Sequence, residues 1–403
     1  MKYLADTDAL VREGVLSAAQ AGEIARRARE DVMHFAINIV LFTGILAVIG
    51  GMAAFLEDMA QITALGTAVT LAGAVALLRA PEAYRLLSNA TAVIGAVLLV
   101  GGAVGWGVQA SGSTGIAAVL GLPIALGAYA VWRRGPGRLR FLAGWLTCLG
   151  VAAHLTGMLS EPLGAVLAGV PPWILYHYAA AVLILCGVAL DIRLVTVLSI
   201  PMLAVALSSR SFYQTGMYGL AIYESTLTVL QMALLAGLCL WLIRSQPDRI
   251  GRHAVILGRL AFIWMNMAFW IGSLWGDKVG YHLWGPRWSD FSADPSWRAD
   301  DSAVAAYEAA RAAFQADATV ISSDAYALVW ALVILAVGIW AAMGARRAVF
   351  NTAVTFGAIH LYTQYFERFD AAPGTVVIAG LIAIGLAYGA WRLNEWMRGR
   401  TPG

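Results

Sequence analysis

Long apolar runs separated by short polar stretches constrain this chain more than any other feature. Twelve of them are about twenty residues long, which is enough for a helix to cross a hydrocarbon core of about 30 Å. Backbone polar groups find no water inside a bilayer, so such runs predict helices. We therefore expect an all-α polytopic membrane bundle of about twelve transmembrane helices. The expected spans are 34–56, 62–80, 89–110, 115–134, 139–159, 173–190, 193–209, 217–243, 254–276, 325–344, 348–367 and 373–393.

Composition supports a membrane protein and excludes several other classes. Hydrophobic residues make up 60% of the chain and charged residues only 13%, unlike an ordinary soluble domain. The net charge of +3 comes from scattered basic residues, which gives no support for nucleic-acid binding. Cys148, Cys186 and Cys239 all lie inside apolar runs, which indicates packing rather than a disulfide framework or a metal site.

Basic residues between the apolar runs predict the orientation. With twelve spans, every basic cluster falls on the side of the N-terminus, which the positive-inside rule identifies as the cytoplasm. Both termini are then cytoplasmic. The N-terminus has no apolar segment behind a basic start, so we expect no cleavable signal peptide. The residues that set the orientation are Arg79, Arg85, Arg133, Arg134, Arg138, Arg140, Arg193, Arg244, Arg249, Arg252, Arg346, Arg347, Arg392, Arg398 and Arg400.

The chain divides into four expected parts. Residues 1–33 form a cytosolic helical segment, 34–276 hold the first nine spans, 277–324 lie outside, and 325–403 hold the last three spans with a short cytosolic tail. In the first part, Asp6 or Thr7 caps one short helix and Gly14 ends it, while Ser17 and Gln20 form a capping box for a second. This segment either orients the first span or docks a cytosolic protein partner.

Residues 277–324 differ in composition from the rest of the chain. They begin with a loop rich in tryptophan and proline, and continue into a segment with the period of an amphipathic helix. Val304, Tyr307, Arg311 and Phe314 share one face of that helix. We expect the aromatic residues to rest at the outer interface and the helix to lie over the mouth of the bundle, as a structural cap, a moving lid or a partner site.

A polar stripe crosses the expected eleventh span. His360, Gln364, Glu367 and Arg368 fall on one side of the helix, about a hundred degrees wide. Ionisable side chains at membrane depth are costly and usually face the bundle interior or a water-filled cavity. The stripe therefore predicts an enclosed polar face.

Other spans carry polar stripes that could face the first one. Three sets have helical spacing, and with Gln109, His154 and His177 they supply the candidate cavity walls. Most of these side chains fall in the outer half of their spans, with Arg259 and His34 nearer the cytoplasm. The sets are Glu224, Thr228 and Gln231; Arg259, Asn266 and Ser273; and His34 and Asn38.

Glu224 and His360 are the sharpest candidates for a function. A buried carboxylate favours its neutral form unless a cation lies nearby, and histidine titrates closest to physiological pH. The two residues could form a protonatable pair on a substrate or proton path. The alternative is that all these polar groups are interhelical hydrogen bonds that hold the bundle together.

Metal and enzyme chemistry find little support. His154, His177 and His360 have no HxxxH or HxH spacing and no cysteine partner, so we expect no metal and no cofactor, and nothing selects haem. Serine, cysteine and zinc hydrolase signatures are absent, which favours a non-enzyme without deciding the matter.

Glycine pairs at four-residue spacing predict close helix packing. They occur at Gly101 and Gly105, Gly272 and Gly276, and Gly385 and Gly389. Small residues let two helix backbones approach each other, so we expect packing faces there.

Three segments resemble a bacterial family of multi-pass membrane proteins of unknown function. They are the REGVLSAAQAGEI element before the first span, the GVQASG ending of the third span, and the closing GAIHLYTQYFERFD. Where that family usually has an aromatic–histidine pair after the glutamine, this chain has Ala110 and Ser111, which weakens the case for carrying a role over to Gln109. The resemblance implies a bacterial inner-membrane protein with a cytosolic N-terminal segment, and it supplies no activity.

The polar stripes favour a transporter-like function. We expect a protein that moves a small polar or charged solute, coupled or not to protons, through a cavity lined by the candidate residues. The alternative is a non-transporting envelope scaffold or sensor that binds protein partners through residues 1–33 and 277–324. No convincing repeat relates 34–209 to 217–393, although many transporters contain one.

Overall fold

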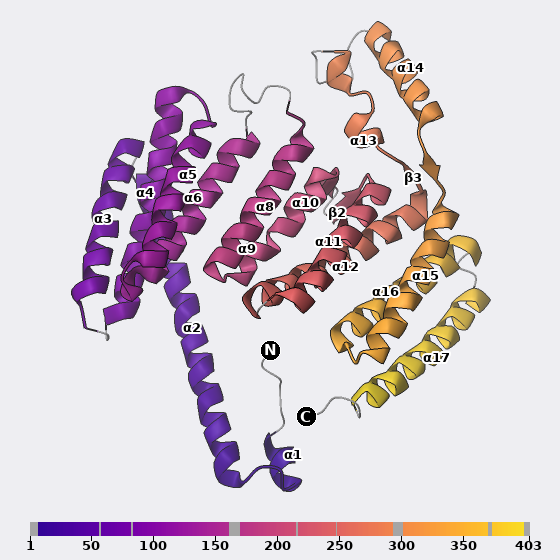
Figure 1. Cartoon of the computed structure of the whole chain (residues 1–403), viewed down its shortest axis with the longest axis horizontal. Coiled ribbons are helices and arrows are strands. Elements are labelled where there is room, and N and C mark those ends of the chain that lie inside the picture. The colour runs from indigo at the N-terminus through magenta and orange to yellow at the C-terminus, as the bar shows by residue number, and fades with distance from the viewer. Residues whose placement is uncertain are drawn as a thin grey trace. The chain divides into compact units, whose positions relative to one another are not determined.

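The protein is helical throughout most of its length. The computed structural model describes residues 7–55, 58–81, 84–160, 170–214, 217–246, 248–292, 301–369 and 373–398. The chain divides into two compact units, Met1–Ala168 and Gly169–Gly403, here called the N-terminal unit and the C-terminal unit. Figure 1 shows the helices of each unit, coloured by residue number along the chain.

The N-terminal unit is a set of helical hairpins. Helices α3 and α4 pack along each other, as do α5 and α6. Asp58 caps α3 through its side chain, which accepts a hydrogen bond from the Ala60 N–H at 2.8 Å, and Gly112 ends α4 in the left-handed conformation. The elements are α1 (Thr7–Arg12), α2 (Ala18–Phe55), α3 (Met59–Arg79), α4 (Arg85–Ser111), α5 (Ile116–Arg134), η2 (Gly137–Leu139) and α6 (Arg140–Ser160).

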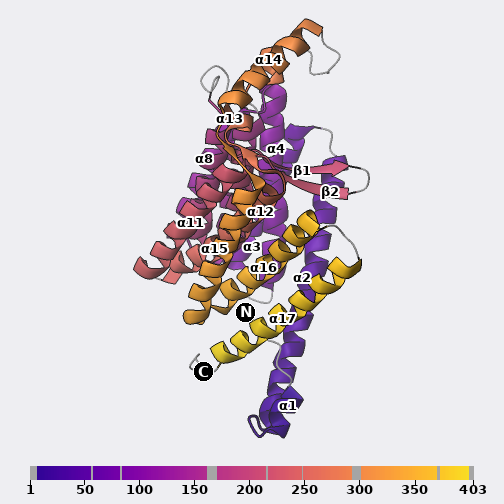
Figure 2. The ribbon, with the colours of Figure 1, turned by 90° about the vertical axis from the view of Figure 1, so that its right-hand side faces the viewer.

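Two of the predicted capping signals at the N-terminus are confirmed, and the predicted cap of the first helix falls on Asp6, which lies outside the described residues. Gly14 has a left-handed φ of 72° just after α1. The Ser17 N–H donates to the Gln20 side chain and the Gln20 N–H donates to the Ser17 hydroxyl, which is a capping box. The second helix, however, does not end at residue 33, where the expected cytosolic segment ends. Helix α2 continues without a break through the expected first span, and Figure 2 shows its full length.

The C-terminal unit adds two small sheets to its helices. Strands β1 and β2 pair antiparallel with Ser209 opposite Ile222, and β3 pairs with β4. The elements are α8 (Pro172–Leu190), α9 (Arg193–Val197), α10 (Ser199–Ala206), β1 (Ser209–Gln214), β2 (Met217–Ile222), α11 (Ser225–Ser245), α12 (Asp248–Trp275), β3 (Asp277–Lys278), α13 (Tyr281–Trp284), η3 (Trp288–Asp290), α14 (Asp301–Asp317), β4 (Val320–Ile321), α15 (Ser323–Met343), α16 (Arg347–Phe369) and α17 (Pro373–Arg398).

Helix α12 is central to the C-terminal unit. It contacts α11, α15 and α16, and the largest buried cluster forms between these four helices. Met232, Phe269 and Trp330 belong to that cluster, and Met232 and Trp330 are fully buried. This core positions the polar side chains that the sequence singled out.

Residues 277–292 and 301–321 form an arm beyond α12 and α15. Figure 1 shows α13 and α14 beyond the ends of those two helices, above the pairing of β3 with β4. The predicted amphipathic helix is present as α14, and its predicted face packs on the aromatic loop. Tyr307 lies 5.6 Å from Trp288 and Phe314 lies 5.9 Å from Tyr281, between ring centroids. The helix thus covers its own loop, and the expectation that it lies over the bundle mouth is not met.

Nine helices in the described residues are long and apolar enough to cross a membrane, and the protein is a multi-pass membrane protein. These are α3, α4, α5, α6 with η2, α8, α11, α12, α15 and α17. The expected first span lies within α2, and the expected eleventh is the helix α16, which carries the polar stripe.

Two expected spans are wrong as single helices. The run 193–209 is broken into α9 and α10, because Pro201 has no N–H to donate to the Val197 carbonyl and its ring crowds that carbonyl. The run 217–243 begins as strand β2, and its helix starts only at Ser225. Aromatic and branched residues in 209–222 favour strands over a helix.

The predicted glycine pairs are only partly confirmed. A Cβ on Gly272 would lie 2.5 Å from the Tyr326 ring, and one on Gly105 would lie 2.8 Å from the Met59 sulfur, so both glycines are packed. Gly276 instead ends α12 with a left-handed φ of 68°. Among the described atoms nothing lies within 4 Å of a Cβ built on Gly101, Gly385 or Gly389, so these three do not mark packed faces.

Candidate functional site

Glu224 lies at the start of α11, and its carboxylate is fully buried. One carboxylate oxygen accepts a hydrogen bond from the Gly280 N–H and the other from the His282 N–H, each at 2.6 Å. The His282 ring nitrogen Nδ1 lies 3.5 Å from the same carboxylate, and the ring stacks on Tyr223. The sequence placed Glu224 about two turns inside a span. That depth is wrong, because the preceding residues form β2.

Asp277 supplies a second buried carboxylate. It follows α12 in β3 and is 8% exposed. Its Oδ2 accepts from the Thr226 N–H at 2.8 Å and from the Tyr326 hydroxyl at 3.3 Å, and that hydroxyl lies 2.5 Å from Thr226 Oγ1. Glu224, Thr226, Asp277, His282 and Tyr326 are here called the carboxylate cluster.

Helix ends explain why the two carboxylates lie here. The first N–H groups of a helix have no partner within it and attract negative charge. Asp277 binds the Thr226 N–H in the first turn of α11, and Glu224 binds two N–H groups at the start of α13. Each carboxylate therefore ties together segments about fifty residues apart in the chain.

The cluster makes protonation of Asp277 easier than usual. Burial raises the pKa of Asp277, and the charge of the nearby Glu224 raises it further, while hydrogen bonds from Thr226 and Tyr326 oppose the rise. Asp277 therefore stays protonated to a higher pH than an ordinary aspartate does.

A second set of polar contacts lies deeper among the helices. The Trp330 indole N–H donates to Asn266 Oδ1 at 2.8 Å, and Asn266 Nδ2 donates to the Phe262 carbonyl at 2.7 Å. The His360 ring meets Trp330 edge to face, with centroids 4.8 Å apart. Tyr326 and Trp330 are four residues apart on α15, so one face of that helix carries both sets.

The predicted pair of Glu224 and His360 is not formed. Both oxygens of Glu224 bind the 280–282 segment, whereas His360 packs on Trp330. The partners that complete each set are Asp277, His282, Tyr326 and Trp330, which the sequence interpretation missed. The signal that could have indicated Tyr326 and Trp330 is their spacing, with two polar-tipped aromatics at i and i+4 in an apolar span.

The other residues of the predicted stripe on α16 differ in burial. Gln364 is half-buried, and its Nε2 has no hydrogen-bond partner within the described part of the chain. Glu367 is exposed, and the side chain of Arg368 lies outside the described residues.

On α12, Asn266 and Ser273 are buried as expected, while Arg259 is exposed. A buried guanidinium without a carboxylate partner would be costly.

The remaining candidates serve local roles. His154 Nδ1 lies 2.8 Å from the Ala118 carbonyl and joins α6 to α5 in the N-terminal unit. His177 Nδ1 lies 2.7 Å from the Trp173 carbonyl in its own helix, and Gln109 is exposed near the end of α4. The side chains of His34 and Asn38 lie outside the described ones. Of His154, His177 and Gln109, only His177 belongs to the same unit as the carboxylate cluster, and its hydrogen bond stays within its own helix.

A histidine that the sequence did not single out lies near the start of α12. His253 is 1% exposed, and its ring nitrogens lie 2.7 Å from Thr196 Oγ1 and 3.0 Å from Asp191 Oδ1. Hydrogen bonds from His253 and Arg252 lower the pKa of Asp191. The trio resembles a nucleophile, base and acid, but Thr196 is fully buried, so no substrate could reach its hydroxyl. It joins the turn after α8 to α12.

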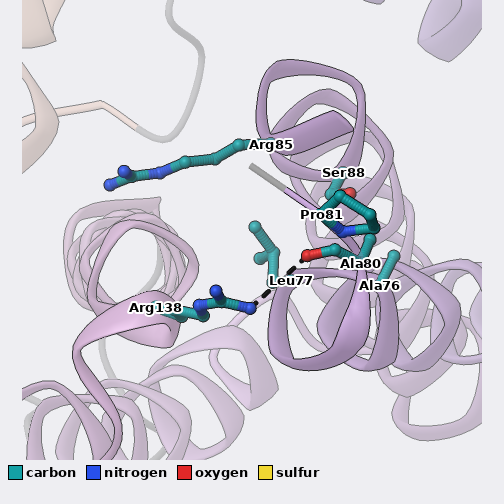
Figure 3. Close-up of a pocket in the computed structure, with 7 residues that line it drawn as sticks. All are labelled: Ala76, Leu77, Ala80, Pro81, Arg85, Ser88 and Arg138. Atoms are coloured by element: carbon teal, nitrogen blue, oxygen red, sulfur yellow. Dashed lines mark hydrogen bonds between the residues drawn. The ribbon is translucent and has the colours of Figure 1, made fainter. Parts of the chain in front are cut away.

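The described residues offer no grouped metal ligands, and the cavity in the N-terminal unit is very small. In the parts of the chain that the structure describes, no three histidine, cysteine or acidic side chains are grouped to hold a metal ion, and the three cysteines form no disulfide. In the N-terminal unit, a cavity of about 10 Å³ lies between Arg85 and Arg138. It has room for about one water molecule. Figure 3 shows Arg138 turned to the Ala80 carbonyl, which it binds as a cap for α3.

Comparison with known proteins identifies no relative. No family model matches the chain, and neither a curated protein nor a solved structure matches it. The resemblance to a bacterial family of membrane proteins of unknown function therefore stays a prediction.

Proposed function

We propose that the protein is a transporter-like bundle in the bacterial inner membrane that moves a small polar or charged solute coupled to protons. The observation that carries this proposal is the pair of buried carboxylates, Glu224 and Asp277, placed next to polar contacts that continue among α12, α15 and α16. Buried ionisable groups in membrane proteins are costly and typically mark ion or proton pathways.

The proton would bind at Asp277. Two carboxylates in one low-dielectric cluster do not both ionise easily, so one of them takes up a proton at higher pH than usual. Both carboxylate oxygens of Glu224 already accept backbone N–H bonds. Asp277 carries the raised pKa and contacts Tyr326 on a different helix, so its protonation would change a contact between α15 and the start of α11.

The solute would meet polar atoms that the protein leaves unbonded. Within the described residues, Thr228 Oγ1, Gln231 Oε1 and Gln364 Nε2 are buried and have no hydrogen-bond partner. Buried polar groups without partners are costly, so water or a polar solute is the natural way to satisfy them. These three atoms come from α11 and α16, on the same unit as the carboxylate cluster.

The proposed orientation keeps both termini in the cytoplasm and twelve crossings of the membrane. Residues 193–206 are helical over about 21 Å at 1.5 Å per residue, and β1 would extend the crossing to the outer surface. Glu224 and Asp277 then lie at the outer ends of their helices. The basic residues between the apolar runs support this arrangement.

Proton flux into vesicles tests the proposal. The purified protein is reconstituted with a pH-sensitive dye inside, and a panel of amino acids, organic acids, sugars and inorganic ions is added outside. At least one solute should acidify the lumen, and Asp277→Asn and Glu224→Gln should each slow that flux by about tenfold or more. Glu367→Gln, on the exposed end of α16, is the matched control and should keep the flux.

Two results of this experiment would contradict the proposal. If no solute moves protons or enters vesicles that contain wild-type protein of native size on gel filtration, the protein is not a transporter of these solutes. Equal flux in Asp277→Asn and wild-type protein would remove the carboxylate from the pathway.

A second candidate function rests on the arm. Helix α14 has no buried residue, and Glu308 and Asp317 are exposed on it, while Tyr307 and Phe314 contact the aromatic loop. Such a surface would suit an envelope scaffold or sensor that binds a protein through 277–324, with residues 1–33 binding another in the cytoplasm. Deleting residues 1–33 should then remove a crosslinked partner while the remaining protein stays folded.

A further inference from the structure

The last three helices enclose an apolar groove that opens along α17. It has a volume of about 790 Å³ and is lined by α15, α16 and α17. Figures 1 and 2 show α17 running alongside α16. Gly380, Gly385 and Gly389 line the groove, and Gly385 and Gly389 have open space where a Cβ would be. A channel of this size, without side chains filling it, is large enough for acyl chains.

The groove runs nearly the depth of a bilayer. Its lining on α17 extends from Val376 to Leu393, which is about 25 Å at 1.5 Å per residue, against a hydrocarbon core of about 30 Å. Along that length the lining is almost wholly aliphatic, aromatic or glycine. The occupant must therefore be apolar over most of its own length.

One end of the groove is cationic. Leu393 packs against the cluster of Ala341, Ala342 and Phe350, which places the end of α17 beside the turn between α15 and α16. Arg347 begins α16 three residues before Phe350, so it lies one turn further toward that end. Arg392 lines a recess that shares Gly389 and Leu393 with the groove, together with Glu395 and Trp396.

Two observations indicate that an anion belongs at this end. Within the described residues, the Nε of Arg347 is buried and has no hydrogen-bond partner, although a buried guanidinium N–H is costly to leave unbonded. Arg346 stacks on Trp340, 4.0 Å from the ring centroid, and Trp340 contacts the same cluster. Three arginines against Glu395 leave the end net positive.

Aromatic residues mark the same end as the membrane interface. Trp391 and Trp396 on α17 are 54% and 44% exposed. Tryptophan is enriched at the level of the lipid headgroups. The cationic end therefore lies where a phosphate would be, and the apolar groove lies where the acyl chains would be.

We propose that the groove between α15, α16 and α17 is a binding site for an anionic phospholipid, whose phosphate is held by Arg347 and Arg392. The phosphate accepts from the unbonded Arg347 Nε and from Arg392, and the acyl chains fill the half of the groove nearer these arginines, over Gly385 and Gly389. This site does not depend on transport by the carboxylate cluster. By the predicted orientation, the lipid belongs to the cytoplasmic leaflet.

A second copy of the chain fits the groove less well. Two copies in one membrane have the same orientation, so a symmetric contact along α17 would bring the arginine end of one copy to that of the other. Like charges at such an interface oppose association. An anionic lipid neutralises the same arginines.

Lipid retention by the full-length protein tests the proposal. The protein is purified in a mild detergent and mixed with dioleoyl phosphatidylglycerol or with dioleoyl phosphatidylcholine, which have the same acyl chains. Native mass spectrometry should show phosphatidylglycerol retained about tenfold more strongly. Arg347→Gln with Arg392→Gln should abolish that preference, while Arg244→Gln, in the last turn of α11, should keep it.

A groove-filling variant separates the site from lipid around the whole protein. Gly385→Leu places a side chain in the groove and should reduce retention of both lipids, while Gly374→Leu, on the same helix but outside the lining, should not. Equal retention of the two lipids by wild-type protein, or an unchanged preference in the double arginine variant, would overturn the proposal. A lipid-free dimer would overturn it in favour of a second copy.

Discussion

The two units hold their helices together in different ways. In the N-terminal unit, helix backbones touch. A Cβ on Gly66 or Gly95 would overlap the backbone of the facing helix in the α3–α4 hairpin, and one on Gly121 or Gly157 would do so between α5 and α6. Direct backbone contact leaves little room for side chains at these positions, although the buried His154 still joins α6 to α5 through one hydrogen bond.

In the C-terminal unit, side chains fill the space between helices. Glu224, Asn266 and Trp330 are fully buried, and each makes a hydrogen bond to another segment or another helix. Most of the buried polar atoms without a partner among the described residues also belong to this unit, whereas the N-terminal unit contributes Asn89.

This difference in packing suggests that the N-terminal unit contributes mainly to stability and the C-terminal unit mainly to function. Close backbone packing gains dispersion energy and tolerates little change, but it offers nothing to a proton or a solute. Helices held apart by polar and aromatic side chains can exchange hydrogen-bond partners. The C-terminal unit is therefore where a function is expected, and the N-terminal unit is where a substitution should do most damage to the fold.

The largest expected effect comes from breaking a backbone contact in the N-terminal unit. Gly121→Leu would force a side chain into the backbone of α6 at His154, and should cost more than about 3 kcal/mol. The variant should lose most of its monodisperse peak on gel filtration in detergent and unfold at a lower temperature than wild-type protein.

The control for this substitution lies on the same helix. Gly127 is exposed on α5, and no described atom lies within 4 Å of its Cβ position, so Gly127→Leu should fold as wild-type protein does. If Gly121→Leu also kept a wild-type elution profile and melting temperature, the account of the N-terminal unit as a backbone-packed body would be wrong.

An intermediate effect should follow from removing a polar contact in the C-terminal unit. Asn266→Leu leaves the buried Trp330 N–H without its acceptor, which should cost about 1–2 kcal/mol. Combining it with Trp330→Phe removes the donor as well. The double variant should lose less stability than the sum of the two single variants, by about 1 kcal/mol in thermal unfolding.

Thr147→Val provides the comparison in the N-terminal unit. The Thr147 hydroxyl bonds only its own helix, at the Ala143 carbonyl, so its loss should cost less than about 0.5 kcal/mol. Strictly additive effects at Asn266 and Trp330 would show that their hydrogen bond does not hold α12 to α15.

The sequence predicts a helix correctly where the length and hydrophobicity of an apolar run are enough to determine its structure. Nine expected spans correspond to long apolar helices, and the Ser17–Gln20 capping box forms because both side chains lie within one turn. The prediction fails at 193–222, where hydropathy is still high. There Pro201 breaks the helix and β1 pairs with β2, and neither event changes a hydropathy average.

The site could be predicted only in part for a related reason. Glu224, Asn266 and His360 stand out because each is polar within an apolar run. Their partners are defined by contacts between distant segments, as in the bond that joins Thr226 to Tyr326, 100 residues later. Helical periodicity reports which residues share a face, but it carries no information on which face meets another helix.

The smallest expected effect is a dependence on pH at the carboxylate cluster. Because the pKa of Asp277 is raised in the folded protein, the folded state binds this proton more tightly than the unfolded chain does. Stability from this residue is then fully present at low pH and is lost as the pH rises through the raised pKa. As the pH rises above the ordinary aspartate pKa of about 4, wild-type protein should therefore lose melting temperature relative to Asp277→Asn.

Asparagine keeps an oxygen that can accept from the Thr226 N–H, so Asp277→Asn removes the titration and leaves much of the contact. Asp317→Asn, at the exposed end of α14, serves as the control and should follow the wild-type curve. Melting curves are recorded for the three proteins in one detergent as the pH is raised from about 4. Parallel curves for wild-type protein and Asp277→Asn would mean that Asp277 does not exchange its proton in this range, and the C-terminal unit would lose its titrating group while keeping its polar packing.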